Sequence, residues 1–112
     1  MTEMCAAKQG FNPEYSEQAP TIEEIEQLTA DAVLEFGAPW CGHCQASAPV
    51  IAAELSARSL CHIKVFDGKG KKLGRVFGVK LWPTLIYLKE GKEIARVVRP
   101  LAAEDMADLL AG

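Results

Sequence analysis

The sequence contains no apolar stretch near the roughly 18 residues that a membrane-spanning helix requires, so we expect no membrane association. Its N-terminus, MTEMCAAKQG, has no basic segment followed by an apolar core, the pattern of a secretory signal. The formal net charge of −3 does not favour nucleic-acid binding. These absences predict a cytoplasmic protein. In that compartment structural disulfides are rare, and a close cysteine pair is more often metal-binding or catalytic.

The composition is that of an ordinary globular chain, because 49% of the 112 residues are hydrophobic and 24% are charged. This length is typical of one domain with a real hydrophobic core. Residues 1–19 are polar, contain proline and lack sustained periodicity, so we interpret them as a flexible N-terminal segment. The folded domain is expected over residues 20–112.

Local patterns predict alternating helices and strands. Thr21 and Glu24 form a capping box, which predicts a helix that begins there and runs to about Thr29. Pro49 lies inside a longer helical pattern that begins at Cys41. Strands are expected over 32–36, 60–66, 84–88 and 93–98, with helices over 41–58, 73–77 and 101–110 and a hairpin turn at Gly91. This order predicts an α/β sandwich with a mixed sheet.

Two cysteines, Cys41 and Cys44, are spaced as CxxC between the first strand and the long helix. A c-type haem site would need histidine directly after the second cysteine, where this chain has Gln45. A zinc site needs about four ligands. The further candidates, Cys61 and His62, are neighbours on one strand and point to opposite faces, so structural zinc is the weaker alternative.

Disulfide exchange fits the cysteine pair better than a structural disulfide does. A bridge between residues three apart closes a small loop and stabilises a fold little. At the start of a helix, however, these positions come close enough to form a disulfide. Unpaired N–H groups there favour a thiolate. We therefore expect Cys41 to be the exposed nucleophile and Cys44 the buried resolving thiol.

The chain resembles the thioredoxin superfamily over residues 20 to 112. The resemblance rests on Trp40-Cys41-Gly42-His43-Cys44, Pro49, Trp82-Pro83-Thr84 and Gly91. It implies a thioredoxin-like three-layer α/β/α sandwich with a central mixed sheet of four or five strands. It also implies dithiol–disulfide exchange with protein substrates, no cofactor, and a cis peptide bond before Pro83.

Glu35 is a charged residue inside an otherwise apolar strand, Ala32 to Phe36. Burial of a carboxylate is costly unless it is neutralised or paired. By the family likeness, Glu35 takes the proton from Cys44 when that thiol attacks the mixed disulfide. Lys64, in the next strand, resembles the lysine that accompanies this acid in the family. The alternative is that its apolar stem simply carries the ammonium group to water.

Several positions depart from the usual thioredoxin pattern. Gly42-His43 between the cysteines is similar to protein disulfide isomerase, and a cationic His43 would make the disulfide more oxidising. By the same likeness the substrate groove is lined by Trp40, Gly42, Trp82, Pro83, Thr84 and Arg99, with Trp82 and Arg99 where the family usually has small residues. Gly37 stands in place of a common aromatic residue. The alternative interpretations are that Trp82 simply packs in the core and that His43 has no effect on the reduction potential.

The sequence thus predicts a monomeric thiol–disulfide oxidoreductase that reduces protein disulfides. Its own cysteine pair is expected to be reduced again by an upstream reductase. The runner-up is a protein-binding or chaperone-like module on the same fold, with secondary redox activity, in which the altered groove holds a partner.

Overall fold

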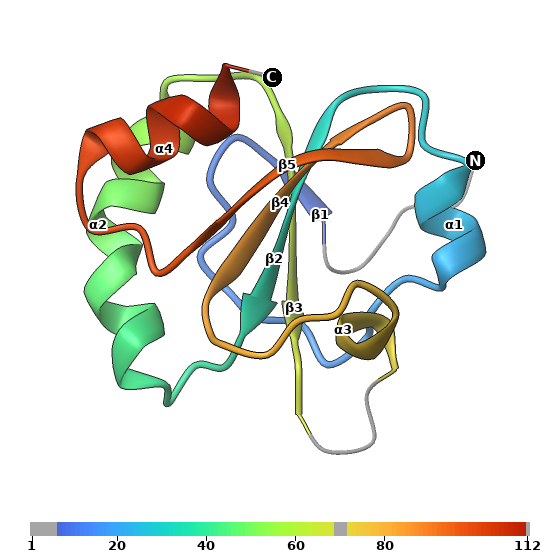
Figure 1. Ribbon diagram of the computed structural model, residues 1–112, viewed down its shortest axis with the longest axis horizontal. Coiled ribbons are helices and arrows are strands. Elements are labelled where there is room, and N and C mark those ends of the chain that lie inside the picture. The colour runs from blue at the N-terminus through green and yellow to red at the C-terminus, as the bar shows by residue number, and fades with distance from the viewer. Residues whose placement is uncertain (1–6, 69–71, 112) are drawn as a thin grey trace.

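The computed structural model describes residues 7–68 and 72–111. A central sheet lies between two pairs of helices, which gives the expected three layers (Figure 1). The strands are β1 (Ala7–Gln9), β2 (Ala32–Gly37), β3 (Cys61–Phe66), β4 (Thr84–Lys89) and β5 (Lys92–Val98). The helices are α1 (Ile22–Glu26), α2 (Gly42–Ser56), α3 (Leu73–Val76) and α4 (Ala103–Leu110).

The sheet has five strands in the order β1-β3-β2-β4-β5. The central strand, β2, runs parallel to β3 and antiparallel to β4, while β1 and β5 pair antiparallel at the edges. The predicted mixed sheet is therefore confirmed, with five strands. Because β2 is paired on both sides and covered on both faces, all six of its residues are buried.

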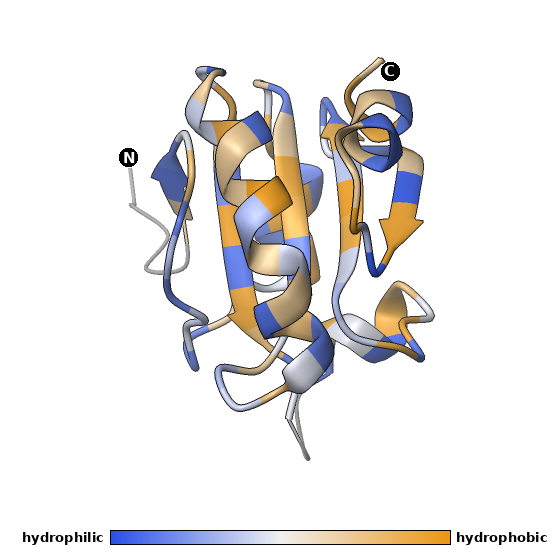
Figure 2. Ribbon diagram, turned by 90° about the vertical axis from the view of Figure 1, so that its left-hand side faces the viewer, coloured by the Kyte–Doolittle hydropathy of each residue, from blue (hydrophilic) through white to orange (hydrophobic). Residues whose placement is uncertain are grey.

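Alternation along the strands divides the core into two parts. One face of β2 carries Ala32, Leu34 and Phe36, which pack with residues of α1 and α3. The other face carries Val33, which packs with residues of α2 and α4. In Figure 2 the strands behind α2 are largely apolar. Glu35 lies on the same face as Val33, toward α2.

The expected element boundaries agree with the structure within a few residues. The capping box of α1 is present, since the Thr21 side chain accepts from the Glu24 backbone N–H and Glu24 accepts in return from the Thr21 backbone N–H. The β4–β5 hairpin turns through Glu90 and Gly91, which both have positive φ, as a two-residue turn of type I′ requires. No helix in the described part of the chain has the length and hydropathy to cross a bilayer.

The structure differs from the sequence-based expectation in the N-terminal segment. Residues 1–6 lie outside the described part, but β1 pairs with β3, and Ser16 forms a further bridge to Val65. Asn12 is buried. The segment from Ala7 onward therefore belongs to the folded domain. The apolar pattern missed it because β1 is a three-residue, mostly exposed edge strand and because the polar contacts of Asn12 and Pro13 are with residues 50 and 51 positions away.

Candidate active site

The two cysteines lie at the beginning of α2, next to the end of β2. Cys41 is the N-cap residue of α2, and its Sγ accepts the backbone N–H of Cys44 at 3.3 Å. Cys41 is 9% exposed and Cys44 is 4% exposed. Cys41 is therefore nearly buried rather than exposed as expected, although it is the more accessible of the two cysteines. It lies at a helix end that supplies donors to a thiolate.

A second loop faces the cysteines. The Trp82–Pro83 peptide bond is cis, and Trp82 packs against the cluster that contains both cysteines. Trp40 is 67% exposed and lies edge-on to Trp82, with ring centroids 5.5 Å apart. Trp82 Nε1 also donates to Asp67 Oδ2 at 3.0 Å, so this ring is fixed at the rim and is not a plain core side chain.

Arg99 holds the backbone of this second loop. It has a positive φ of 54° and donates its backbone N–H to Pro83 O at 2.9 Å and its side-chain Nε to Trp82 O at 2.8 Å. Thr84, at the start of β4, is buried, and its hydroxyl donates to Leu81 O at 2.6 Å. Arg99 and Thr84 therefore support the cis-proline loop through hydrogen bonds to its backbone.

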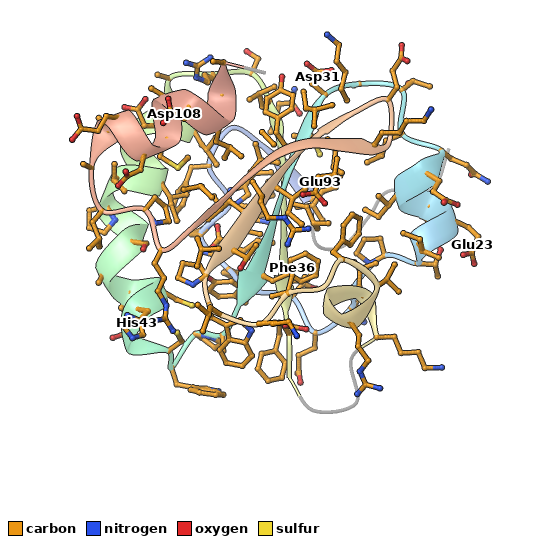
Figure 3. All side chains as sticks on the ribbon, in the orientation of Figure 1. Glu23, Asp31, Phe36, His43, Glu93 and Asp108 are labelled. Atoms are coloured by element: carbon orange, nitrogen blue, oxygen red, sulfur yellow. The ribbon has the colours of Figure 1, made fainter. Side chains whose placement is uncertain are left out.

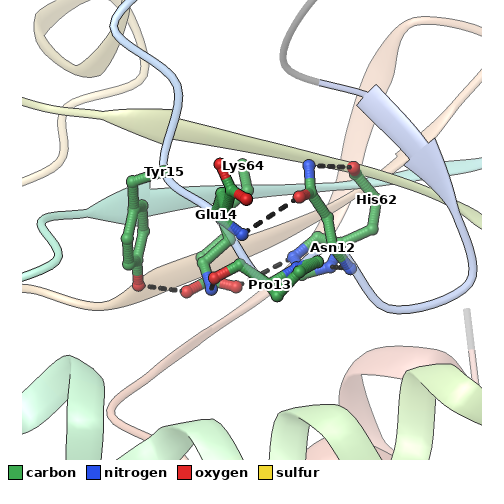
Figure 4. A network of polar contacts seen from close by, with 7 residues as sticks. Asn12, Pro13, Glu14, Tyr15, His62 and Lys64 are labelled. Atoms are coloured by element: carbon green, nitrogen blue, oxygen red, sulfur yellow. Dashed lines mark hydrogen bonds and ion pairs between the residues drawn. The ribbon is translucent and has the colours of Figure 1, made fainter.

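Glu35 is buried on the face of the sheet that α2 covers, with two hydrogen-bonding partners. It is 1% exposed, and its Oε1 lies 2.8 Å from Nε2 of the fully buried His62. Its other oxygen, Oε2, accepts the hydroxyl proton of Tyr15 (Figure 4). The carboxylate is therefore satisfied inside the core by two neutral donors.

The tautomer of His62 follows from its other neighbour. The backbone N–H of Asn12 donates to Nδ1 of His62 at 2.9 Å, so Nδ1 must carry the lone pair. The ring proton is then on Nε2 and is donated to Glu35. Asn12 Nδ2 also donates to His62 O at 3.3 Å. The N-terminal segment thus fixes the ring that orients the buried carboxylate.

Lys64 lies on the same face of the sheet and pairs in register with Glu35. Its Nζ donates to Pro13 O at 3.2 Å and lies 4.3 Å from the centre of the Tyr15 ring. Burial lowers the pKa of Lys64, an effect opposed by the charges of Glu35 and Cys44. In the described part of the chain, the hydrogen-bonding partners of Glu35 are His62 and Tyr15, so Lys64 is a neighbour of the acid without bonding to it.

Gly37 leaves the space in which Cys44 and Tyr15 meet. A Cβ at this position would lie 2.6 Å from Cys44 Sγ and 2.7 Å from the Tyr15 hydroxyl oxygen. Burial raises the pKa of Cys44 to about 11, with a hydrogen bond to Cys41 adding to this and one to Tyr15 opposing it. Burial and the adjacent Glu35 raise the pKa of Tyr15 well above its ordinary value. Both groups therefore rest in their protonated forms.

The other predicted site residues lie around the rim or away from the acid. His43 and Gly42 are exposed in the first turn of α2, and Figure 3 labels His43 at that end of the helix. Cys61 is half-buried against the opposite core from His62, as adjacent strand positions require. Over residues 7–68 and 72–111, no group of three or more His, Cys, Asp or Glu could hold a metal ion.

Sequence reasoning missed Tyr15, Asn12 and the contact of His62 with Glu35. His62 did carry a signal, because His62 and Lys64 are two apart in a buried strand and must share a face. Neither Tyr15 nor Asn12 carried one, since they lie in an irregular segment and reach partners 20 and 50 residues away.

Comparisons with known proteins agree with this geometry. The family model described as Thioredoxin matches residues 15–111. The structure of thioredoxin 2 from Pseudomonas aeruginosa in its reduced form has a TM-score of 0.80 and 44% identity, covering 89% of this chain and 94% of that chain. Thioredoxin 1 of Synechococcus elongatus is 27% identical over 90 residues, 79% of this chain and 84% of that protein.

Protein disulfide isomerases are also similar over part of their length. Protein disulfide-isomerase A2 of Pongo abelii is 39% identical over 88 residues, which are 70% of this chain but 16% of that protein. This chain therefore spans only about a sixth of that relative. A cysteine pair at a helix start, a cis-proline loop beside it and the family match over residues 15–111 lead to one conclusion: the chain belongs to the thioredoxin family and is a thiol–disulfide oxidoreductase.

Proposed function

We propose that the protein is a monomeric reductase of protein disulfides that works through Cys41 and Cys44 in the cytoplasm and is recharged by an upstream reductase. The observation that carries the proposal is the position of Cys41 Sγ at the N-terminus of α2, next to the cis-proline loop. The similarity to a thioredoxin over nearly its whole length supports reduction as the direction.

The reaction has two exchange steps. The Cys41 thiolate attacks a substrate disulfide, forms a mixed disulfide and releases one substrate thiolate, which water protonates. Cys44 then loses its proton and attacks Cys41 Sγ. The second substrate thiolate leaves as the Cys41–Cys44 bond forms. The substrate gains two electrons, and the cysteine pair loses them.

Glu35 is the proposed base for the second step. A carboxylate buried on the α2 face of the sheet can accept the proton that Cys44 must lose, and it can return that proton in the reverse reaction. Burial lowers the pKa of Lys64, and the negative charges of Glu35 and of the Cys44 thiolate oppose this; in this proposal the lysine supplies a positive charge beside both groups. His43 is exposed in the first turn of α2, and in this proposal its protonated form favours the Cys41 thiolate.

The proposed substrate surface surrounds the cysteines. Trp40 packs edge-on against Trp82, and Leu81 precedes Trp82 in the cis-proline loop; they are 67% and 49% exposed, so apolar surface adjoins the site. An extended substrate segment would lie across Trp40, Gly42 and the Trp82-Pro83 backbone. Because Arg99 Nε already occupies Trp82 O, such a segment must displace this side chain or pair with the remaining backbone groups.

Reduction of insulin disulfides tests the proposal. With dithiothreitol or an upstream reductase as the electron donor, the wild-type protein should accelerate the reaction and Cys41→Ser should be inactive. Cys44→Ser should instead accumulate a covalent adduct with a substrate protein, visible on a non-reducing gel. An active Cys41→Ser, or a Cys44→Ser that traps nothing, would reject the proposed roles. If Cys41→Ser still binds reduced substrate tightly, the protein-binding function becomes the better description.

A further inference from the structure

Glu35 does not face Cys44 with a free oxygen. Its Oε1 accepts from His62, and its Oε2 accepts from the Tyr15 hydroxyl. Tyr15 in turn packs against the cluster that contains both cysteines. Figure 4 shows Tyr15 in the segment that precedes the first helix, with its hydroxyl in the polar network. The same hydroxyl bonds to Glu35 and borders the space at Gly37 that Cys44 Sγ also borders, so a phenol hydroxyl lies between the proposed base and the resolving thiol.

The space for this hydroxyl is created by Gly37. A methyl group at this position would lie 2.6 Å from Cys44 Sγ and 2.7 Å from the Tyr15 oxygen, so both atoms border the same small volume. An aromatic side chain here would fill it completely. Because Gly37 has no side chain, the Tyr15 hydroxyl has room to lie beside Cys44.

We propose that Tyr15 is a catalytic residue that relays the proton between Cys44 and Glu35. This inference rests on the proposed exchange reaction. As Cys44 attacks Cys41 Sγ, its S–H proton passes to the Tyr15 oxygen while the Tyr15 hydroxyl proton passes to Glu35 Oε2. Tyr15 stays neutral throughout, Glu35 becomes the neutral acid, and the Cys41–substrate bond breaks as the Cys41–Cys44 bond forms. Reversal of the same transfers serves the opposite direction.

A hydroxyl suits this role because it can donate and accept at once. Burial and Glu35 raise the pKa of Tyr15 well above its ordinary value, so the phenolate does not accumulate. His62 acts as a positioning residue. Its Nδ1 is fixed by the Asn12 backbone N–H, so Nε2 continues to donate to Oε1 whether Oε2 is charged or protonated.

Water is the rival carrier. A pocket of about 330 Å³ is lined by Tyr15, Pro39, Cys44 and Lys64 among others, so solvent can approach the resolving thiol from this side. The two routes make different predictions, because a water molecule in this pocket would still serve Cys44 if Tyr15 lost only its hydroxyl group.

The experiment compares Tyr15→Phe with the wild type in a stopped-flow reaction of reduced protein with substoichiometric Ellman's reagent. A first, concentration-dependent phase reports attack by Cys41 and releases one thionitrobenzoate. A second, concentration-independent phase reports attack by Cys44 and releases the other. At neutral pH we expect Tyr15→Phe to slow the second phase about 100-fold, as for loss of general acid–base catalysis, and to leave the first phase unchanged.

The pH profile separates a relay from a structural effect. Around Cys44 the titratable groups are Cys41 on its own helix, Tyr15, Glu35 of β2 and Lys64 of β3. As the pH approaches the pKa of Cys44, about 11, the thiolate forms without a base and the deficit of Tyr15→Phe should shrink. A structural defect would slow the second phase equally at every pH.

Two further variants provide controls. Tyr87→Phe removes another tyrosine hydroxyl that donates to a carboxylate, Asp31, at the opposite end of β2, and should leave both phases unchanged. In a Glu35→Gln background, Tyr15→Phe should add little, because the two groups act in one transfer. A slowing that multiplies fully with that of Glu35→Gln would overturn the relay.

The outcomes also separate this inference from the proposed function. If the wild-type protein shows no second phase, the dithiol mechanism itself fails. If the wild type shows both phases and Tyr15→Phe keeps the wild-type rate and profile, the mechanism stands and the relay is wrong, with pocket water as the carrier.

Discussion

Nε2 of His62 lies 2.8 Å from Oε1 of Glu35, and both side chains are inaccessible to solvent. The residues lie on adjacent strands and share the sheet face that α2 covers. Because Nδ1 of His62 accepts a backbone N–H, the ring is a neutral donor to the carboxylate. The contact is a charge-assisted hydrogen bond rather than a pair of opposite charges.

This relationship predicts a large loss of stability for His62→Leu. The variant leaves Glu35 buried with one donor fewer and removes the acceptor of the Asn12 N–H. Deletion of one partner from a buried charged contact costs about 3 kcal/mol or more. We expect a decrease of that size in the free energy of unfolding, measured by urea denaturation of the reduced protein.

The exposed ion pair between Glu93 and Arg96 serves as the matched control. Its Nε–Oε2 distance is 2.6 Å, but both side chains are about one-third exposed. Glu93→Gln should therefore cost less than about 1 kcal/mol. Equal losses of unfolding free energy for His62→Leu and Glu93→Gln would mean that the buried contact stabilises the fold no more than the exposed ion pair does.

Gly37→Ala should damage both stability and the second exchange step. The added methyl group would meet Cys44 Sγ and the Tyr15 hydroxyl at distances that require one of them to move. Overpacking of this kind costs about 1–3 kcal/mol. We expect a lower urea midpoint, together with a slower second phase in the reaction with Ellman's reagent.

Gly42→Ala controls for the loss of a glycine near the cysteines. A Cβ there meets nothing within 4 Å, and the residue is the first of α2. Stability should be unchanged or slightly higher, because alanine has the better helix propensity. If Gly37→Ala behaved like Gly42→Ala in both measurements, the space at Gly37 would have no role.

The sequence was sufficient to predict the family and most of the fold. Glu35 stood out because a charge in a doubly covered strand conflicts with burial, and the structure places it on the face toward α2. The predicted turn at Gly91 and the capping box of Thr21 are local patterns, and both are present. Sequence patterns therefore predicted those structural features that depend on residues close together in the chain.

The partners of Glu35 could not be predicted in the same way. Tyr15 reaches it from a segment without hydrophobic periodicity, and the segment is held by long-range polar contacts such as that of Asn12 with His62. The family likeness pointed instead to Lys64, whose ammonium group bonds to Pro13 O. Only the three-dimensional register of β2 and β3 brings Glu35, Lys64 and His62 to one face.

The reduced protein should lose stability in strongly alkaline solution because of Cys44. Burial raises the pKa of Cys44 from 9.0 to about 11, so the folded state favours the thiol over the thiolate. The resulting stabilisation is complete below pH 9 and is lost as the pH rises through about 11. A shift of this size corresponds to about 2 to 3 kcal/mol.

Comparison with Cys44→Ala isolates this contribution from those of Lys64 and Tyr15. The difference in unfolding free energy between the reduced wild type and Cys44→Ala should shrink by that amount between pH 8 and pH 11, a window set by the pKa of Cys44. A difference that stays constant across this range would show that the thiol ionises equally well in both states.

Substitution of His43 tests what sets the reduction potential of the Cys41–Cys44 pair. This residue is exposed at the second position of α2, where the backbone N–H has no partner within the helix, so His43→Pro is compatible with the fold. If a positive charge on His43 stabilises the Cys41 thiolate, its removal destabilises the dithiol form. The reduction potential should then become more negative, by up to the roughly 90 mV that separates thioredoxin from protein disulfide isomerase.

Equilibration with glutathione or dithiothreitol buffers measures this potential, and the fluorescence of Trp40 and Trp82 provides the signal because both rings lie beside the cysteines. His43→Gln separates charge from ring rigidity, since it removes the charge without adding a proline. A shift in both variants assigns the effect to the charge of His43. A shift in His43→Pro alone assigns the effect to the backbone, and no shift in either variant shows that His43 does not influence the potential.

The wild-type potential itself tests the direction of the reaction. A value near that of the isomerase would mean that the site favours donating disulfides, and the proposed direction would have to be reversed.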